Sequence, residues 1–205
     1  MIDVRTLFVI GRNYAKAGDA PASGDPVVTL KPISSLAWPG TPLRLPAFSC
    51  EVHHEIELTL LIGRRTRDVA EREALDAVAG YGVGLDLTAF DVQQHAKANG
   101  LPWTICKGFD TAGALAPFVA PAEAGDPSRL RFALDVNGER RQSGDASLMT
   151  HSFARIVAYL SSVFTLDRGD VIYTGTPAGA RALAPGDELV LSMNDRERGR
   201  FTVAR

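Results

Sequence analysis

The chain has 205 residues, of which 22 are Lys or Arg and 24 are Asp or Glu, so its formal net charge is −2. This charge argues against nucleic-acid binding by bulk electrostatic attraction, and no apolar run is long enough to cross a membrane. A hydrophobic content of 45% is typical of a globular protein, and the length favours a single domain over residues 1–205.

Hydrophobic periodicity and turn signals predict the elements that follow, in chain order. They are strands at 6–10, 27–30 and 54–62, a helix at 68–78, a strand at 80–87, a helix at 88–97 capped by Thr88, a hairpin at 130–142, a helix at 150–164, and strands at 171–174, 188–193 and 200–203. The pair Asn137-Gly138 is typical of a two-residue hairpin turn. Because strands and helices do not alternate regularly, we expect an α+β fold.

Three carboxylates stand out on two of the predicted strands. Glu55 and Glu57 share one face of the first strand, roughly 7 Å apart along it, and Asp86 ends the second. Oxygen ligands favour Mg²⁺, Mn²⁺ or Ca²⁺ over zinc. The alternative is a solvated strand face that carries two acids. The neighbouring pair His53-His54 does not favour zinc, because adjacent residues of a strand point to opposite faces.

The sequence carries few features that indicate a cellular compartment. The N-terminus lacks the basic and apolar stretches of a signal peptide, and Cys50 and Cys106 form no C-x-x-C pair. We therefore expect a reduced, cytoplasmic protein.

Short motifs run along the chain around these carboxylates. They are G-R-N-Y-A (11–15), L-K-P (30–32), H-H-E-I-E-L (53–58), G-Y-G (80–82), L-D-L-T (85–88), D-V-Q (91–93), L-P-W (101–103), K-G-F-D (107–110), V-N-G (136–138) and T-G-T-P (174–177). In this combination and order the chain resembles the fumarylacetoacetate hydrolase family, over about residues 7–193. The resemblance implies a rolled mixed β-sheet with a few peripheral helices, and a homodimer.

The resemblance also implies roles for individual residues. Glu55, Glu57 and Asp86 would hold Mg²⁺ or Mn²⁺, Lys107 matches the family's active-site lysine, and Thr176 matches a threonine that contacts substrate. Arg12 and Gln93 lie in motifs near the same pocket and are expected to bind substrate.

A small keto acid is the implied substrate, with no nucleic-acid or membrane partner. The implied reactions are C–C hydrolysis of acylpyruvates or fumarylpyruvate and decarboxylation of oxaloacetate, each through a metal-stabilised enolate. An isomerase or tautomerase is one alternative. A metal- and ligand-binding homologue with little catalysis is another.

Three departures from the family pattern bear on this choice. Hydrolytic members carry a histidine three residues after the tyrosine of the N-Y motif, with a glutamate shortly beyond, and this chain has Ala17 there and Asp19 as its only nearby acid. Phe90 occupies a position where relatives often have an arginine, and Arg181 lies where they have a Gly-Val-Gly run. An aromatic ring cannot grip a carboxylate bidentately. The metal site is therefore expected to be complete, while hydrolysis loses its water-activating pair.

Overall fold

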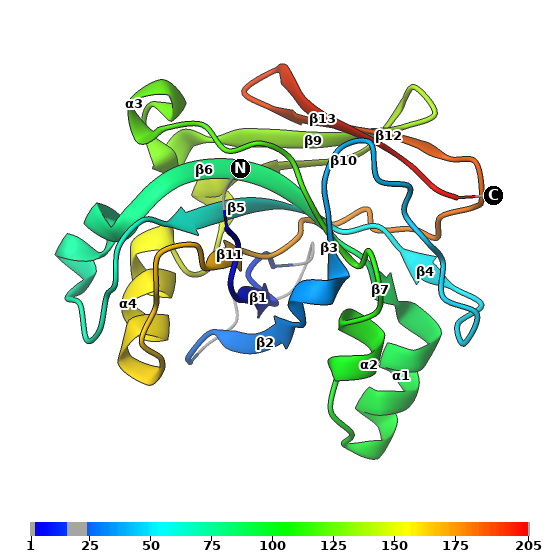
Figure 1. The fold of residues 1–205 in the computed structure, drawn as a ribbon, viewed down its shortest axis with the longest axis horizontal. Coiled ribbons are helices and arrows are strands. Elements are labelled where there is room, and N and C mark those ends of the chain that lie inside the picture. The colour runs from blue at the N-terminus through cyan, green and yellow to red at the C-terminus, as the bar shows by residue number, and fades with distance from the viewer. Residues whose placement is uncertain (1–2, 16–23, 205) are drawn as a thin grey trace.

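A computed structural model describes residues 3–15 and 24–204 of the chain (Figure 1). Its largest sheet has seven strands in the order β2 (Val27–Lys31), β1 (Leu7–Gly11), β11 (Val171–Tyr173), β5 (Ile56–Ile62), β6 (Val78–Asp86), β8 (Gly113–Leu115) and β3 (Leu36–Ala37). The sheet is mixed, since β1 pairs parallel with β11 but antiparallel with β2. The long strands β5 and β6 pair antiparallel and curve across the middle of the molecule.

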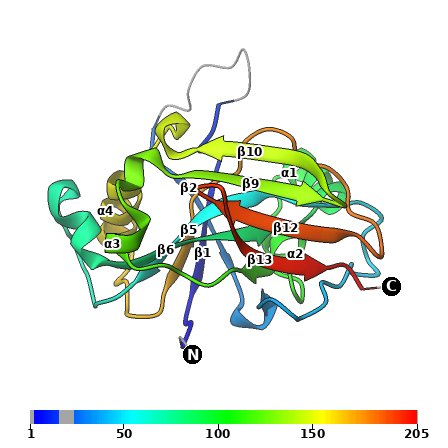
Figure 2. The same ribbon diagram turned by 90° about the horizontal axis from the view of Figure 1, so that it is seen from above.

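A second sheet covers one face of β5 and β6 (Figure 2). Its four strands lie in the order β10 (Glu139–Asp145), β9 (Arg131–Val136), β12 (Glu188–Met193) and β13 (Arg196–Thr202), and all neighbours are antiparallel. The predicted hairpin joins β9 to β10, and both of its turn residues have positive φ, 53° at Asn137 and 80° at Gly138. Positive φ at both central residues is the geometry that favours Asn-Gly there.

The helices are few and lie at the two ends of the long strands (Figure 1). They are α1 (Phe90–Asn99), α2 (Thr104–Lys107), α3 (Pro121–Ala124) and α4 (Phe153–Val163). The best-defined one is α4, whose first turn is capped by the Ser152 hydroxyl, which accepts from the amide of Arg155 at 3.1 Å. A short two-stranded ribbon, β4 (Val52–His53) with β7 (Thr88–Ala89), lies beside α1.

The main hydrophobic core forms around β5 and β6 and takes in apolar side chains of the second sheet and of α4. Every residue of β5 is buried, on both faces of the strand. A strand that is covered on both sides can place a polar side chain in the interior, where water does not screen its charge. Among the described residues, no helix is both long enough and apolar enough to cross a membrane.

The predicted fold class, the hairpin and the helix before β11 are confirmed, and two predicted helices need correction. Residues 68–78 do not form an α-helix, because Asp68 has a φ of 50° and only a 3₁₀ helix follows, Glu71–Ala77. The predicted cap Thr88 belongs instead to β7, and α1 begins two residues later, at Phe90. Backbone pairing with β4 therefore takes precedence over local capping preference at this position.

Candidate functional site

The carboxylates of Glu55, Glu57 and Asp86 come together at one end of the β5–β6 pair. One ligand oxygen from each lies within 4.8 Å of the others. The antiparallel register explains this, since the amide of Asp86, the last residue of β6, donates to the carbonyl of Glu55 at 2.9 Å, just before β5 begins. Glu57 and Asp86 are each only 1% exposed. The alternative of a solvated strand face is therefore wrong.

Lys107, at the last position of α2, reaches into this cluster. Its Nζ donates to Oε2 of Glu55 at 2.7 Å and to the hydroxyl of Thr88 at 2.6 Å, and it also contacts Oδ2 of Asp86. Burial favours the neutral amine, but the negative charges of Asp86 and Glu55 outweigh it and raise the pKa of Lys107 above its ordinary value. The structure thus places the predicted active-site lysine, as an ammonium, directly beside two of the acids.

A second buried lysine contacts the same cluster from the other side. Lys31, the last residue of β2, places its Nζ 2.7 Å from Oδ1 of Asp86 and 3.3 Å from the carbonyl of Leu87, and it also donates to the carbonyl of Lys107. Asp86 therefore has one lysine Nζ beside each oxygen, although burial lowers the pKa of Lys31. Burial alone would raise the pKa of Asp86, but Lys107 and Lys31 together lower it. The Leu30-Lys31-Pro32 motif is visible in the sequence, but it does not by itself indicate that Lys31 belongs to the site.

Glu57 differs from its two neighbours because it has no positive partner among the described residues. Its Oε2 accepts one hydrogen bond, from the amide of Gly175 at 2.7 Å, and no Lys, Arg or His side chain in the described chain pairs with it. Burial, followed by the charge of Asp86, raises its pKa well above the ordinary value. Buried charges are usually paired or bound to a metal. Three carboxylates in contact with only two lysine side chains form an oxygen-rich donor set, which fits a hard divalent cation.

The loop after β11 brings Thr176 next to the acids. Its hydroxyl donates to the carbonyl of Ile56 at 2.9 Å, between Glu55 and Glu57, and its neighbour Gly175 binds Glu57. The same loop is tied to the Gly-Arg-Asn-Tyr segment, since the Asn13 side-chain amide donates to the carbonyl of Thr174 at 2.8 Å. Two motifs that are far apart in the sequence therefore meet beside the acids.

Two predicted substrate-binding residues make no contact with the acids. Arg12 is exposed, with a φ of 60°, and its side chain forms no ion pair with a described residue. Gln93 is buried on α1, and its Oε1 accepts from Nζ of Lys97 at 2.8 Å. Their predicted roles remain predictions.

The departures from the family pattern fall in three places, and one of them is Arg181, which is exposed and whose carbonyl accepts from the His54 amide at 3.0 Å. Phe90 stacks on His53 with ring centroids 4.2 Å apart, and His53 lies directly opposite Thr88 in the β4–β7 ribbon. Nε2 of His53 is 2.7 Å from a carboxylate oxygen of Glu51. An aromatic surface therefore borders the threonine that Lys107 contacts. Ala17 and Asp19 lie outside the described residues.

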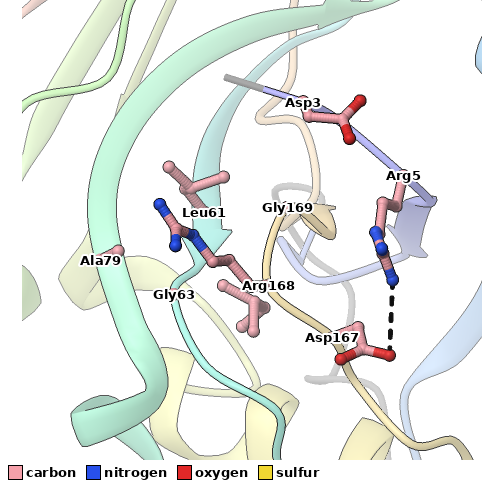
Figure 3. A pocket seen from close by; sticks show the side chains of 9 residues that line it. Asp3, Arg5, Leu61, Gly63, Ala79, Asp167, Arg168 and Gly169 are labelled. Carbon is pink, nitrogen blue, oxygen red and sulfur yellow. Dashed lines mark ion pairs between the residues drawn. The ribbon is translucent and has the colours of Figure 1, made fainter. Parts of the chain in front are cut away.

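A separate cavity of about 580 Å³ opens at the far end of β5 (Figure 3). Its charged lining residues are Asp3, Arg5, Asp167 and Arg168, and Arg5 pairs with Asp167 at 3.7 Å. The two signs of charge balance, and none of the predicted site residues lines it. The acids at the other end of the strand remain the better candidate for chemistry.

Comparison with known proteins agrees with this geometry. The family model described as fumarylacetoacetate (FAA) hydrolase C-terminal matches residues 6–204. The chain is 40% identical to the mitochondrial oxaloacetate tautomerase FAHD1 of Bos taurus, over 98% of this chain and 92% of the relative. It is 42% identical to the oxaloacetate tautomerase YcgM of Escherichia coli strain K12, over 93% and 89%.

A solved structure of similar fold is fumarylpyruvate hydrolase from Pseudomonas aeruginosa in complex with Mn²⁺ and pyruvate. It superposes with a TM-score of 0.92 at 33% identity, over 99% of this chain and 91% of the other. These relatives are enzymes that process keto acids. By sequence and by fold, the chain belongs to the fumarylacetoacetate hydrolase family.

Proposed function

We propose that this protein is a divalent-metal-dependent oxaloacetate tautomerase, with Mg²⁺ or Mn²⁺ held by Glu55, Glu57 and Asp86. The observation that carries the proposal is the buried carboxylate cluster, in which Glu57 has no cationic partner among the described residues. The two tautomerase relatives at 40% and 42% identity support the reaction. Tautomerisation moves one proton between C3 and the C2 oxygen of oxaloacetate, and neither breaks a C–C bond nor consumes water.

The side chains around the acids suit this reaction. A bound cation would supply Lewis-acid polarisation of the keto oxygen. Lys107 would add a positive charge beside a substrate oxygen held at this cluster, and burial would strengthen the effect. Lys31 holds Asp86 in place from the opposite side. In this assignment Lys107 is the catalytic residue and Thr176 contacts the substrate.

Hydrolysis of acylpyruvates or fumarylpyruvate is the second candidate. The fumarylpyruvate hydrolase of similar fold favours it. Hydrolysis, however, needs an activated water and hence a general base. The sequence has Ala17 where hydrolytic members carry histidine. This difference is why we place tautomerisation first.

One experiment separates these reactions. The purified protein is incubated with Mg²⁺ or Mn²⁺ and either oxaloacetate or acetylpyruvate, and the products are followed by NMR. We expect accelerated enol–keto exchange of oxaloacetate without CO₂ release, abolished by a chelator. Pyruvate and acetate formed from acetylpyruvate and water would instead establish the hydrolase, and rapid CO₂ release the decarboxylase. Binding of oxalate without turnover of either compound would show that the protein binds such ligands but does not catalyse their conversion.

Oligomeric state is a separate part of the proposal. Family resemblance leads us to propose a homodimer, which sedimentation velocity would show as a species of about twice the 21.9 kDa chain mass. A single species at the monomer mass would contradict it.

A further inference from the structure

We propose that Gln142, on β10 in the second sheet, is a positioning residue that fixes how Thr176 meets the substrate. The inference rests on the proposed function, because it concerns the same site. Gln142 is 2% exposed. Its Oε1 accepts from the Ile56 amide at 3.1 Å and lies 2.9 Å from Nδ1 of His54. Its Nε2 donates to the Thr176 hydroxyl at 3.0 Å and to the carbonyl of Pro177 at 2.9 Å.

These contacts determine the orientation of the side-chain amide. The backbone amide of Ile56 can only donate, so the atom facing it must be the oxygen. The carbonyl of Pro177 can only accept, so the atom facing it must be the nitrogen. The same logic makes Nδ1 of His54 a donor. All four hydrogen-bonding positions of the amide are occupied, and a flipped amide would turn the wrong atom toward both backbone partners.

The fixed amide constrains the hydroxyl of Thr176. A hydroxyl has one proton and two lone pairs. The proton of Thr176 points to the carbonyl of Ile56 at 2.9 Å, and one lone pair accepts from Gln142. Toward a substrate, the hydroxyl can therefore act only as an acceptor, as it would for an enolic O–H. The backbone amide of Thr176 has no acceptor within the described chain, so it is the donor left for a carboxylate.

Gln142 reaches this position because β10 is irregular there. The pairing of β10 with β9 shifts register between Arg140 and Gln142. A bulge of this kind turns a side chain out of its regular alternation. The loop that carries Thr176 then packs against the bulge, since a Cβ on Gly179 would lie 2.6 Å from the carbonyl oxygen of Arg141. The second sheet thereby supplies a contact that the β5–β6 pair cannot make by itself.

The test compares Gln142→Met, which keeps the length of the side chain and removes its hydrogen bonds, with Thr176→Val and with the double variant. Loss of the bond to Thr176 should raise KM for oxaloacetate about tenfold, equivalent to one hydrogen bond, with kcat nearly unchanged. The double variant should be no worse than the more affected single variant, because both remove the same contact. Pyruvate affinity in the presence of Mn²⁺, measured by calorimetry, should fall in parallel.

Ser161→Ala is the matched control. Ser161 is fully buried on α4, where its hydroxyl accepts from the Val69 amide at 3.1 Å and donates to the carbonyl of Ala158 at 2.8 Å. Its loss should lower the melting temperature without changing KM. If Gln142→Met does not fold, Gln142→Glu keeps both acceptor contacts and loses both donors, and it should show the same rise in KM.

Two results would overturn the proposal. An unchanged KM and pyruvate affinity in Gln142→Met, with a stability loss like that of Ser161→Ala, would make the residue purely structural. Fully multiplicative effects in the double variant would show that Gln142 does not act through Thr176. A wild-type protein that neither binds pyruvate nor turns over oxaloacetate would overturn the proposed function itself, before any variant is compared.

Discussion

At the scale of single residues, the feature that organises the site is the unequal number of lysine partners of its three acids, of which Glu57 and Asp86 are buried and Glu55 is partly exposed. Asp86 has two lysine partners and Glu55 has one. Glu57 accepts a single backbone hydrogen bond. A carboxylate that is desolvated and left without a counter-charge destabilises the fold until a cation binds. Glu57 is thus the residue through which metal binding and stability should be most tightly linked.

Glu57→Gln should change metal binding and stability in opposite directions. The neutral amide keeps the shape and can still accept from Gly175, so the metal-free protein should melt at a higher temperature. Mn²⁺ binding by calorimetry should be lost. Since the raised pKa lets folded Glu57 bind a proton at higher pH than the unfolded chain does, the gain should grow as the pH rises and shrink on acidification. Undiminished Mn²⁺ affinity would contradict the assignment.

Lys31→Met should destabilise the protein. The change leaves Oδ1 of Asp86 buried without its lysine partner while Lys107 stays on Oδ2, so the cost should approach but not exceed the roughly 3–5 kcal/mol of an uncompensated buried charge. Arg131→Met is the control, because Arg131 and Asp195 form an ion pair at 2.9 Å with both side chains exposed, and such pairs contribute about 1 kcal/mol or less. The two free energies of unfolding, measured in urea, should differ clearly. Equal values would mean that Lys31 does not stabilise Asp86.

The sequence allowed only part of this residue-level picture to be predicted. Glu57 lies on β5 and Glu55 directly precedes it, two positions earlier, so their shared face follows from extended-chain geometry. Lys31 contacts Asp86 although the two are 55 positions apart, and the sequence around neither residue predicts that contact. The same holds for Gln142, which depends on a bulge that the hairpin pattern does not show. Long-range partners of this kind come from the topology rather than from spacing.

At the scale of elements, the T-G-T-P turn after β11 is the piece of backbone that completes the site. Gly175 has a φ of 105°, and a Cβ there would lie 2.7 Å from Cβ of Asn13. Only glycine combines that conformation with that close approach. The element also shows a limit of sequence reasoning, because the motif indicated its importance while its contact with Asn13 depends on the parallel pairing of β1 with β11.

Gly175→Ala and Gly138→Ala should separate conformational strain from close packing. Gly138 has a φ of 80°, and no atom lies within 4 Å of the place that an added methyl group would take, so alanine should cost about 1–2 kcal/mol through backbone strain alone. At Gly175 the overlap with Asn13 should add roughly 1–3 kcal/mol and displace the amide that binds Glu57. Urea unfolding and Mn²⁺ calorimetry check both parts. Equal losses of stability, with normal metal affinity in both variants, would contradict this account of the turn.

At the scale of the whole molecule, the site is assembled from segments spread over most of the chain. Lys31 comes from β2, the carboxylates from the β5–β6 pair, Lys107 from α2 and Thr176 from the loop after β11. No single strand, helix or loop carries all of these side chains. Unfolding any of the contributing strands would separate the ligands, so cation binding should be coupled to the folding of the entire sheet.

Metal should therefore raise the melting temperature of the wild-type protein as a single cooperative transition. At a free Mn²⁺ concentration about 100 times its Kd, mass action adds about 2.7 kcal/mol to the stability of the folded state. For a chain of this size that corresponds to a rise of about 5–10 °C. Scanning calorimetry across a Mn²⁺ series would measure it, with Glu57→Gln as the variant expected to show no rise. Saturable Mn²⁺ binding without any thermal shift would mean that the ligands stay together when the sheet unfolds, and would place the cation elsewhere.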